Sequence, residues 1–156
     1  MAGAHRIFAF DLHPWRCQAA LEWGADEAFC LTDGDPVAFL NKATQGRGAD
    51  VVIEAAWADK SVQQAADMAA MGARVVLVGI PEDDNLSLKH STARRKGLSL
   101  ILSRRMKHTY PRAIKLAERI DLVKLVTHRF SLKDTPKAYQ RTSAYEQGLI
   151  KSLINI

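Results

Sequence analysis

The chain has 156 residues, of which 47% are hydrophobic and 25% charged, a profile typical of one ordinary folded domain and unlike that of a disordered or fibrous protein. Its net charge of +5 lies in short basic clusters without interleaved aromatic residues, which argues against nucleic-acid binding. No apolar run approaches the ~20 residues of a membrane helix and the N-terminus lacks a secretory cleavage pattern, so we expect a cytoplasmic protein that binds neither nucleic acid nor membrane.

Short apolar runs alternate with helical patterns along the first half of the chain. In order, we expect a strand at 6–11 (RIFAFD), a helix from Pro14 to Gly24, a strand at 27–31, a helix from Asp35 and Pro36 to Gly46, a strand at 50–56 (DVVIEAA) and a helix from about Ser61 that Gly72 stops. Proline in the first helical turn and glycine just past the last turn are ordinary start and stop signals. This alternation predicts parallel strands joined by crossover helices.

The second half continues the same pattern. In order, we expect a strand at 73–79 (ARVVLVG), a turn at 80–84, a polar loop through about Lys96, a strand at 98–103 (LSLILS), a helix from Pro111, a short helix through Ala138 and Tyr139 after Ser131 and Asp134 at capping-box spacing, and a terminal strand at 149–156 (LIKSLINI). The fold class expected from the whole chain is α/β with a doubly wound parallel sheet.

The cysteines and histidines do not suggest a metal site. Cys17 and Cys30 form no CxxC pair and have no histidine at metal-ligand spacing, so we expect reduced packing residues. His108 and His128 stand without a carboxylate or metal partner at a readable spacing, which favours structural roles. We therefore assign no catalytic residue and no metal ligand in this chain.

Five segments, in this order, carry a family resemblance. They are RIFAFDLHPWRCQAALEWGAD, GADVVIEAAW, GARVVLVGIPED, YPRAIKLAERIDL and VTHRFSLKDTPKAY. Together they resemble the second half of the zinc-containing medium-chain alcohol and polyol dehydrogenases, especially the sorbitol-dehydrogenase-like members. The resemblance implies a single truncated dinucleotide-binding domain over 1–156, Rossmann-like, with the family's C-terminal helix and strand at about 127–156. The family's first strand has no counterpart, and no G-x-G-x-x-G phosphate turn occurs in the sequence.

The candidate cofactor residues begin at the end of the first strand. Asp11 lies where a carboxylate can accept hydrogen bonds from both adenosine ribose hydroxyls and repel a 2′-phosphate, which predicts NAD rather than NADP. A cap for the helix opened by Pro14 is the alternative role, and the resemblance favours the ribose. Arg16 matches a basic position that contacts the same ribose in the family, while a solvated first-turn side chain is its alternative.

Two further candidates come from the later strands. Val78, Gly79 and Ile80 end a buried strand at the edge of the sheet where ligands of doubly wound folds lie, and the family places this backbone against the nicotinamide. Packing accounts for these three residues equally well. Lys151 matches a basic position that reaches the pyrophosphate in the family, although an ordinary polar residue on a terminal strand is the favoured reading.

These residues predict the NAD(H)-binding portion of a zinc-type alcohol or polyol dehydrogenase that binds NAD weakly and is inactive alone. In the family, zinc polarises the alcohol oxygen, and its ligands lie in the half that has no counterpart here. One alternative is that a separate chain supplies the catalytic half. Another is a non-catalytic oligomerising scaffold or remnant that binds no cofactor.

A sheet of order 3-2-1-4-5-6 without its first strand would leave the strands at 6–11 and 50–56 each with an unpaired buried edge. We expect these two strands to pair directly. Borrowing the terminal strand at 149–156 and accepting a strand from another chain are the alternatives. The strand at 98–103 presents an apolar edge, which predicts a homodimer through that edge.

Overall fold

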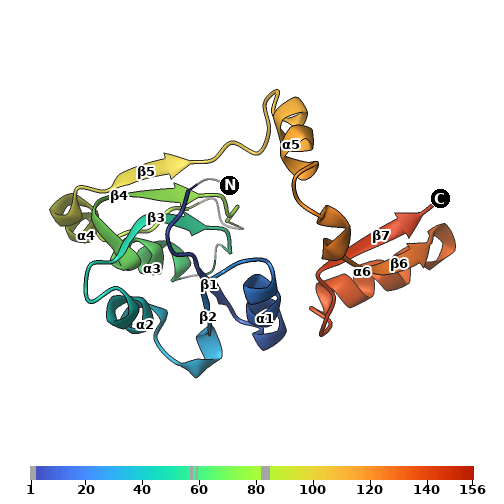
Figure 1. Ribbon diagram of the computed structural model, residues 1–156, viewed down its shortest axis with the longest axis horizontal. Helices are drawn as coiled ribbons and strands as arrows, with labels where there is room; N and C mark the ends of the chain where they lie inside the picture. The colour runs from blue at the N-terminus through green and yellow to red at the C-terminus, as the bar shows by residue number, and fades with distance from the viewer. Residues whose placement is uncertain (1–2, 57, 59, 82–84) are drawn as a thin grey trace. The chain divides into compact units, whose positions relative to one another are not determined.

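The computed structural model describes residues 3–56, 58, 60–81 and 85–156 (Figure 1). The predicted turn at 80–84 lies partly outside the described residues. Contacts divide the chain into two compact units, the first made of Met1–Cys30 with His108–Ile156 and the second of Leu31–Lys107. Every strand pair in both units is parallel, as the alternation of strands and helices predicts.

The first unit begins with a strand, a helix and a strand. These are β1 (Phe8–Asp11), α1 (Pro14–Glu22) and β2 (Glu27–Cys30). β1 and β2 pair in parallel, with Asp11 opposite Cys30 at the carboxyl end. Pro14 starts the helix, and Gly24 just beyond it has a φ of +100°, a left-handed conformation that glycine adopts without steric cost. This part of the chain agrees with the prediction.

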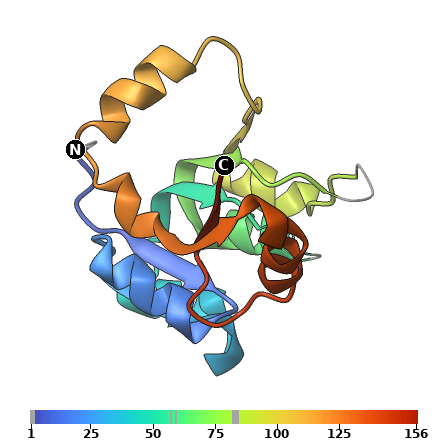
Figure 2. The same cartoon turned by 90° about the vertical axis from the view of Figure 1, so that its right-hand side faces the viewer.

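The rest of the first unit comes from the C-terminal third of the chain. It contains α5 (Tyr110–Ala117), η2 (Leu122–Leu125), β6 (Val126–Ser131), η3 (Leu132–Asp134), α6 (Thr135–Ser143) and β7 (Lys151–Asn155). β6 and β7 pair in parallel with α6 as the connection between them, and Figure 2 presents this part toward the viewer. The terminal strand is confirmed, whereas the sequence patterns did not predict β6.

The second unit is a three-stranded parallel sheet with helices. It contains η1 (Leu31–Asp33), α2 (Pro36–Ala43), β3 (Ala49–Glu54), α3 (Ser61–Met68), β4 (Ala69–Leu77), α4 (His90–Lys96) and β5 (Ser99–Leu102), with strand order β3-β4-β5. The Asp35 carboxylate caps α2 by accepting a hydrogen bond from the Val37 amide at 2.9 Å. Residues of α3 and β4 form the core of this unit: Val62, Ala65, Ala69, Ala70, Ala73, Val75 and Leu77.

The transition from α3 to β4 corrects one prediction. Gly72 does not stop the helix, because α3 ends at Met68 and β4 begins at Ala69, with Gly72 inside the strand at a φ of +69°. A short, alanine-rich stretch suits a buried helix and a buried strand alike, so its pattern does not mark the boundary. Gly48 lies against this transition, and a Cβ there would approach the Met68 carbonyl oxygen to 2.8 Å. Only glycine therefore fits at position 48.

A second correction concerns the segment predicted as a polar loop through Lys96. The structure forms the helix α4 there, ending at Gly97 with a left-handed φ of +61°. None of the α4 residues is buried and its last turn is basic, so the sequence lacks the apolar repeat that identifies a surface helix. No helix of the described chain is both long and apolar enough to cross a membrane.

The strands at 6–11 and 50–56 belong to different units, so their expected direct pairing stays a prediction. Among the described strands, β1 pairs with β2 and β3 pairs with β4, in separate sheets. The terminal strand β7 pairs with β6 in a two-stranded sheet.

Candidate functional site

Asp11 ends β1, and both of its carboxylate oxygens have neighbours. Oδ1 accepts a hydrogen bond from the backbone amide of His13 at 2.9 Å, and Oδ2 lies 3.8 Å from Nη1 of Arg16. The cap position of α1 is held by His13, which makes no side-chain cap bond, so Asp11 supports the turn before the helix rather than capping it directly. The structure thus brings Asp11 and Arg16 together at the carboxyl end of a parallel strand pair.

The Asp11–Arg16 ion pair is half-exposed, and its two charged groups are not within hydrogen-bond distance. The side chains of Asp11 and Arg16 retain 32% and 35% of their exposure, and a separation of 3.8 Å is an ion-pair distance that is too long for a hydrogen bond. Since a ribose presents two adjacent hydroxyls, a carboxylate that accepts and a guanidinium that donates can bind both at once. The chemistry of this pair fits an adenosine ribose.

Three aromatic rings, those of His13, Trp15 and Tyr145, lie close together beside Arg16. The guanidinium carbon lies 5.0 Å from the centre of the Trp15 ring and 5.3 Å from that of Tyr145, distances typical of cation–π contacts. The His13 ring stacks on Trp15 at 5.7 Å and on Tyr145 at 5.4 Å. We call His13, Trp15, Arg16 and Tyr145 the aromatic cluster; no sequence pattern predicted it, because Tyr145 comes from the turn after α6.

The thiols of Cys17 and Cys30 lie close to the carboxyl end of β1. The Cys17 thiol is 3.8 Å from the carbonyl oxygen of Asp11, and the Cys30 thiol is 3.4 Å from that of Leu12. Both residues are buried and neither forms a disulfide. Burial raises the pKa of the Cys17 thiol, which keeps it protonated and unreactive near neutral pH. Cys17 and Cys30 thus pack as predicted.

Val78, Gly79 and Ile80 follow β4 in the second unit. The backbone amides of Val78 and Gly79 both donate to the carbonyl oxygen of Glu54, at 2.8 and 3.2 Å, and tie the end of β4 to the end of β3. Val78 and Ile80 are exposed. This geometry agrees with the strand-end position that the sequence predicts, while Asp11 and Arg16 belong to the other unit.

Lys151 is the first residue of β7 and its side chain is exposed. Its carbonyl oxygen accepts a hydrogen bond from the Thr127 hydroxyl at 3.5 Å, and its Cα pairs with Val126 in the sheet. Lys151 thus lies on the terminal strand, and its predicted contact with the pyrophosphate stays a prediction.

Each unit also contains a cavity away from these residues. In the first unit a cavity of about 610 Å³ has α1 on one side; its lining residues are Ala19, Glu22, Trp23, Ile120, Asp121, Lys124, Thr127 and Ile150. In the second unit a cavity of about 530 Å³ lies beside α3; its lining residues are Asp35, Val37, Lys60, Gln63, Gln64, Asp67, Ser87, Leu88 and Lys89. None of the candidate cofactor residues lines either cavity. No group of three His, Cys, Asp or Glu side chains in the described part of the chain could hold a metal ion.

Comparison with known proteins adds evidence from relatives. Residues 1–119 match the model of a family described as zinc-binding dehydrogenases. An L-threonine 3-dehydrogenase of Symbiobacterium thermophilum is 36% identical over 96% of this chain and 44% of its own length. A sorbitol dehydrogenase of Bacillus subtilis is 27% identical over 97% of this chain and likewise 44% of its own. The chain thus spans less than half the length of these curated relatives.

Solved structures of dehydrogenases also match this chain. The crystal structure of 2R,3R-butanediol dehydrogenase from Bacillus subtilis has a TM-score of 0.87 and 25% identity, with 99% of this chain and 45% of that chain covered. An oxidoreductase/dehydrogenase of unknown specificity from Escherichia coli has a TM-score of 0.88 at 25% identity, with 99% and 44% covered. The predicted Rossmann-like fold class is confirmed, and the chain belongs to the zinc-binding dehydrogenase family as a partial member of it.

Proposed function

We propose that this chain is the NAD(H)-binding portion of a zinc-type alcohol or polyol dehydrogenase and that Asp11 binds the adenosine ribose. The observation that carries the proposal is the half-exposed Asp11–Arg16 pair at the carboxyl end of β1, where doubly wound sheets bind nucleotides. An acceptor and a donor 3.8 Å apart match two neighbouring hydroxyls, and a carboxylate at this position disfavours a 2′-phosphate. The cofactor is therefore NAD rather than NADP.

The chain's own residues do not supply the rest of the reaction. The sequence has no G-x-G-x-x-G turn to receive the pyrophosphate, so binding rests on the adenosine half and is weak. Hydride transfer in a zinc-type enzyme needs a metal to polarise the alcohol oxygen, and its ligands would come from a catalytic half outside this sequence. A separate chain is one source of that half. Two cysteines that remain thiols suit a cytoplasmic location.

Titration calorimetry with NADH tests this proposal. We expect wild-type protein to give a binding heat at millimolar NADH and Asp11→Ala to weaken binding by on the order of tenfold or more, because the charge-assisted hydrogen bonds to the ribose are lost. Asp33→Ala is a matched control, since Asp33 is an exposed aspartate on η1 outside the site. Absence of heat with the wild type, or equal heat with Asp11→Ala, would reject the proposal.

A scaffold without cofactor binding is the second candidate. The observation that favours it is β5, which among the described strands pairs with β4 alone and has Ile101 and Leu102 exposed. A further strand at that edge would bury these side chains and form a homodimer. Strand pairing at β5 leaves Asp11 free to bind NAD, so the calorimetric result distinguishes the two candidates: a pure scaffold gives no heat with NADH.

A further inference from the structure

Four helices in the described part of the chain end in the same hydrogen-bonded turn. In each, the amide after a left-handed residue donates to a carbonyl in the last helical turn: Ala25 to Ala20 at 2.9 Å, Gly46 to Asn41 at 2.7 Å, Leu98 to Ala93 at 3.0 Å, and Glu146 to Arg141 at 3.2 Å. This Schellman turn requires a left-handed residue at the helix end, and glycine is its usual occupant. The residues found there are Gly24, Gln45, Gly97 and Tyr145, with φ values of 100°, 54°, 61° and 49°.

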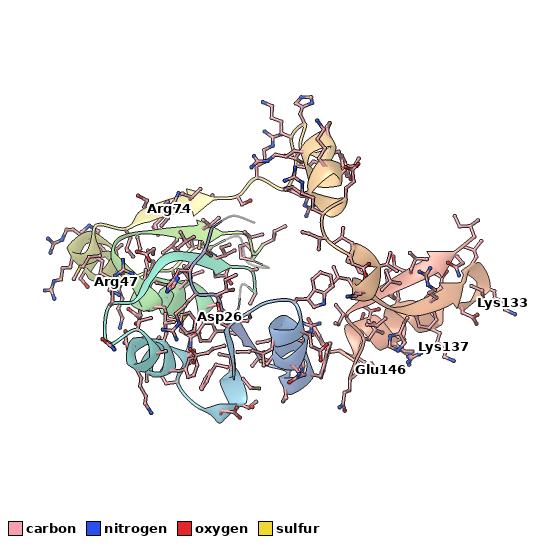
Figure 3. The ribbon with its side chains drawn as sticks, viewed as in Figure 1. Asp26, Arg47, Arg74, Lys133, Lys137 and Glu146 are labelled. Carbon is pink, nitrogen blue, oxygen red and sulfur yellow. The ribbon has the colours of Figure 1, made fainter. Side chains whose placement is uncertain are left out.

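Tyr145 is an unexpected residue for this position. A side chain in the left-handed region brings its Cβ close to the following carbonyl oxygen, and only asparagine and aspartate relieve this by local hydrogen bonding. The turn itself is well held, because Glu146, labelled in Figure 3, pairs with Arg141 across it. The turn therefore does not need an aromatic ring at position 145.

The Tyr145 ring contacts the candidate nucleotide site. It stacks on His13 with an interplanar angle of 28° and lies 5.3 Å from the Arg16 guanidinium, while 58% of the residue stays exposed. Gln45 occupies the same place in the same turn after α2, is exposed, and makes no ring contact. Tyr145 and Gln45 can therefore be compared directly, because both are left-handed residues in the same kind of turn and only Tyr145 lies at the site.

The Arg16 guanidinium contacts the rings of Trp15 and Tyr145 and lies beyond hydrogen-bond distance of the Asp11 carboxylate. Arg16 remains 3.8 Å from Asp11, whereas Arg47 closes on Asp50 with hydrogen bonds of 2.5 and 2.8 Å where no ring intervenes. A guanidinium kept beside the carboxylate, without being closed on it, leaves both groups directed at a common ligand. Arg47 is labelled in Figure 3.

We propose that Tyr145 is a positioning residue of the nucleotide site, whose ring holds the Arg16 guanidinium beside Asp11 so that both groups reach one ribose diol. This inference rests on the proposed binding of NAD at Asp11. It assigns a function to the turn after α6, and it explains why a tyrosine occupies a glycine position.

The test combines NADH titration calorimetry with thermal unfolding. Tyr145→Gly removes the ring and suits the left-handed turn, so we expect NADH affinity to fall roughly two- to fivefold, the range of an exposed cation–π contact, while the melting temperature holds or rises. Tyr145→Asn is a second ringless variant that tolerates the turn, and Tyr145→Phe should restore wild-type affinity. Gln45→Gly is the matched control, with the same backbone relief and unchanged affinity.

A double-mutant cycle separates positioning from simple contact. In an Arg16→Ala background, Tyr145→Gly should weaken NADH binding no further, because the ring acts through the guanidinium. Equal losses in both backgrounds, or unchanged affinity in Tyr145→Gly and Tyr145→Asn, would overturn this inference while Asp11→Ala still reports on the proposed function. No heat with wild-type protein would overturn both.

Discussion

At the scale of single residues, Lys96 binds the carbonyl groups at the C-terminal end of α3. Its ammonium group donates to the carbonyl oxygens of Ala66, Asp67 and Ala69 at 3.1, 2.6 and 2.8 Å. Since α3 runs into β4 without a glycine turn, the Ala66 and Asp67 carbonyls at its end have no partner within the helix, and a cation at a helix C-terminus also complements the helix dipole. One side chain therefore stabilises the junction between α3 and β4.

Replacement of Lys96 by methionine should destabilise the fold. Lys96→Met keeps the aliphatic stem and removes the three donors, and buried acceptors left without a partner cost about 1–3 kcal/mol. We expect a lower midpoint of urea unfolding with an unchanged slope. The control is Arg95→Met, which removes an exposed cation from the next position on α4. A Lys96→Met midpoint equal to that of the control would show that these bonds contribute nothing to stability.

The residues of the site differ in how far sequence could predict them. The place of Asp11 at a strand end follows from the apolar run RIFAFD, whereas its ribose role and the choice of Arg16 follow from the family resemblance; the structure places the two side chains 3.8 Å apart. Lys151 follows from the family resemblance alone, and its contact with the pyrophosphate stays a prediction. Tyr145 could not be predicted, since its ring meets Arg16 and His13 through tertiary contacts between residues far apart in the sequence.

At the scale of elements, the strands with continuous apolar runs were predictable and the charged or half-polar ones were not. β3 and β5 are found where residues 50–56 and 98–103 predict them. β6 (VTHRFS) has only two apolar residues, Val126 and Phe130, and α4 has no buried residue, so neither sequence carries a clear apolar repeat. Their positions are set by parallel pairing with β7 and by the contacts of Lys96, which are tertiary interactions.

The edge of β5 makes the homodimer testable. Light scattering should give twice the mass of the 17.3 kDa chain, and Leu102→Lys should return the protein to the monomer, because a charge on an exposed strand edge opposes strand pairing. Leu132→Lys adds the same charge at an exposed leucine on η3 and should leave the dimer intact. A wild-type monomer would contradict dimerisation through this edge, as would a Leu102→Lys dimer.

At the scale of the whole molecule, the chain consists of two units with parallel strands. It spans less than half of the length of the relatives. The zinc-binding dehydrogenase model matches residues 1–119, and the curated relatives are covered over 44% of their length. Each unit has its own parallel strand pairs: β1 with β2 and β6 with β7 in the first, and the sheet β3-β4-β5 in the second.

The central claim is that the adenosine half of NAD binds at the carboxyl end of β1. Backbone amide NMR of isotopically labelled protein titrated with NADH tests it most directly, since it locates the ligand by residue. The account predicts the largest shift changes at Asp11, His13, Arg16 and Tyr145, with the amides around α3 unaffected. Shift changes confined to Lys60, Gln63 and Asp67, which line the cavity of the second unit, would contradict it, as would a spectrum that NADH leaves unchanged.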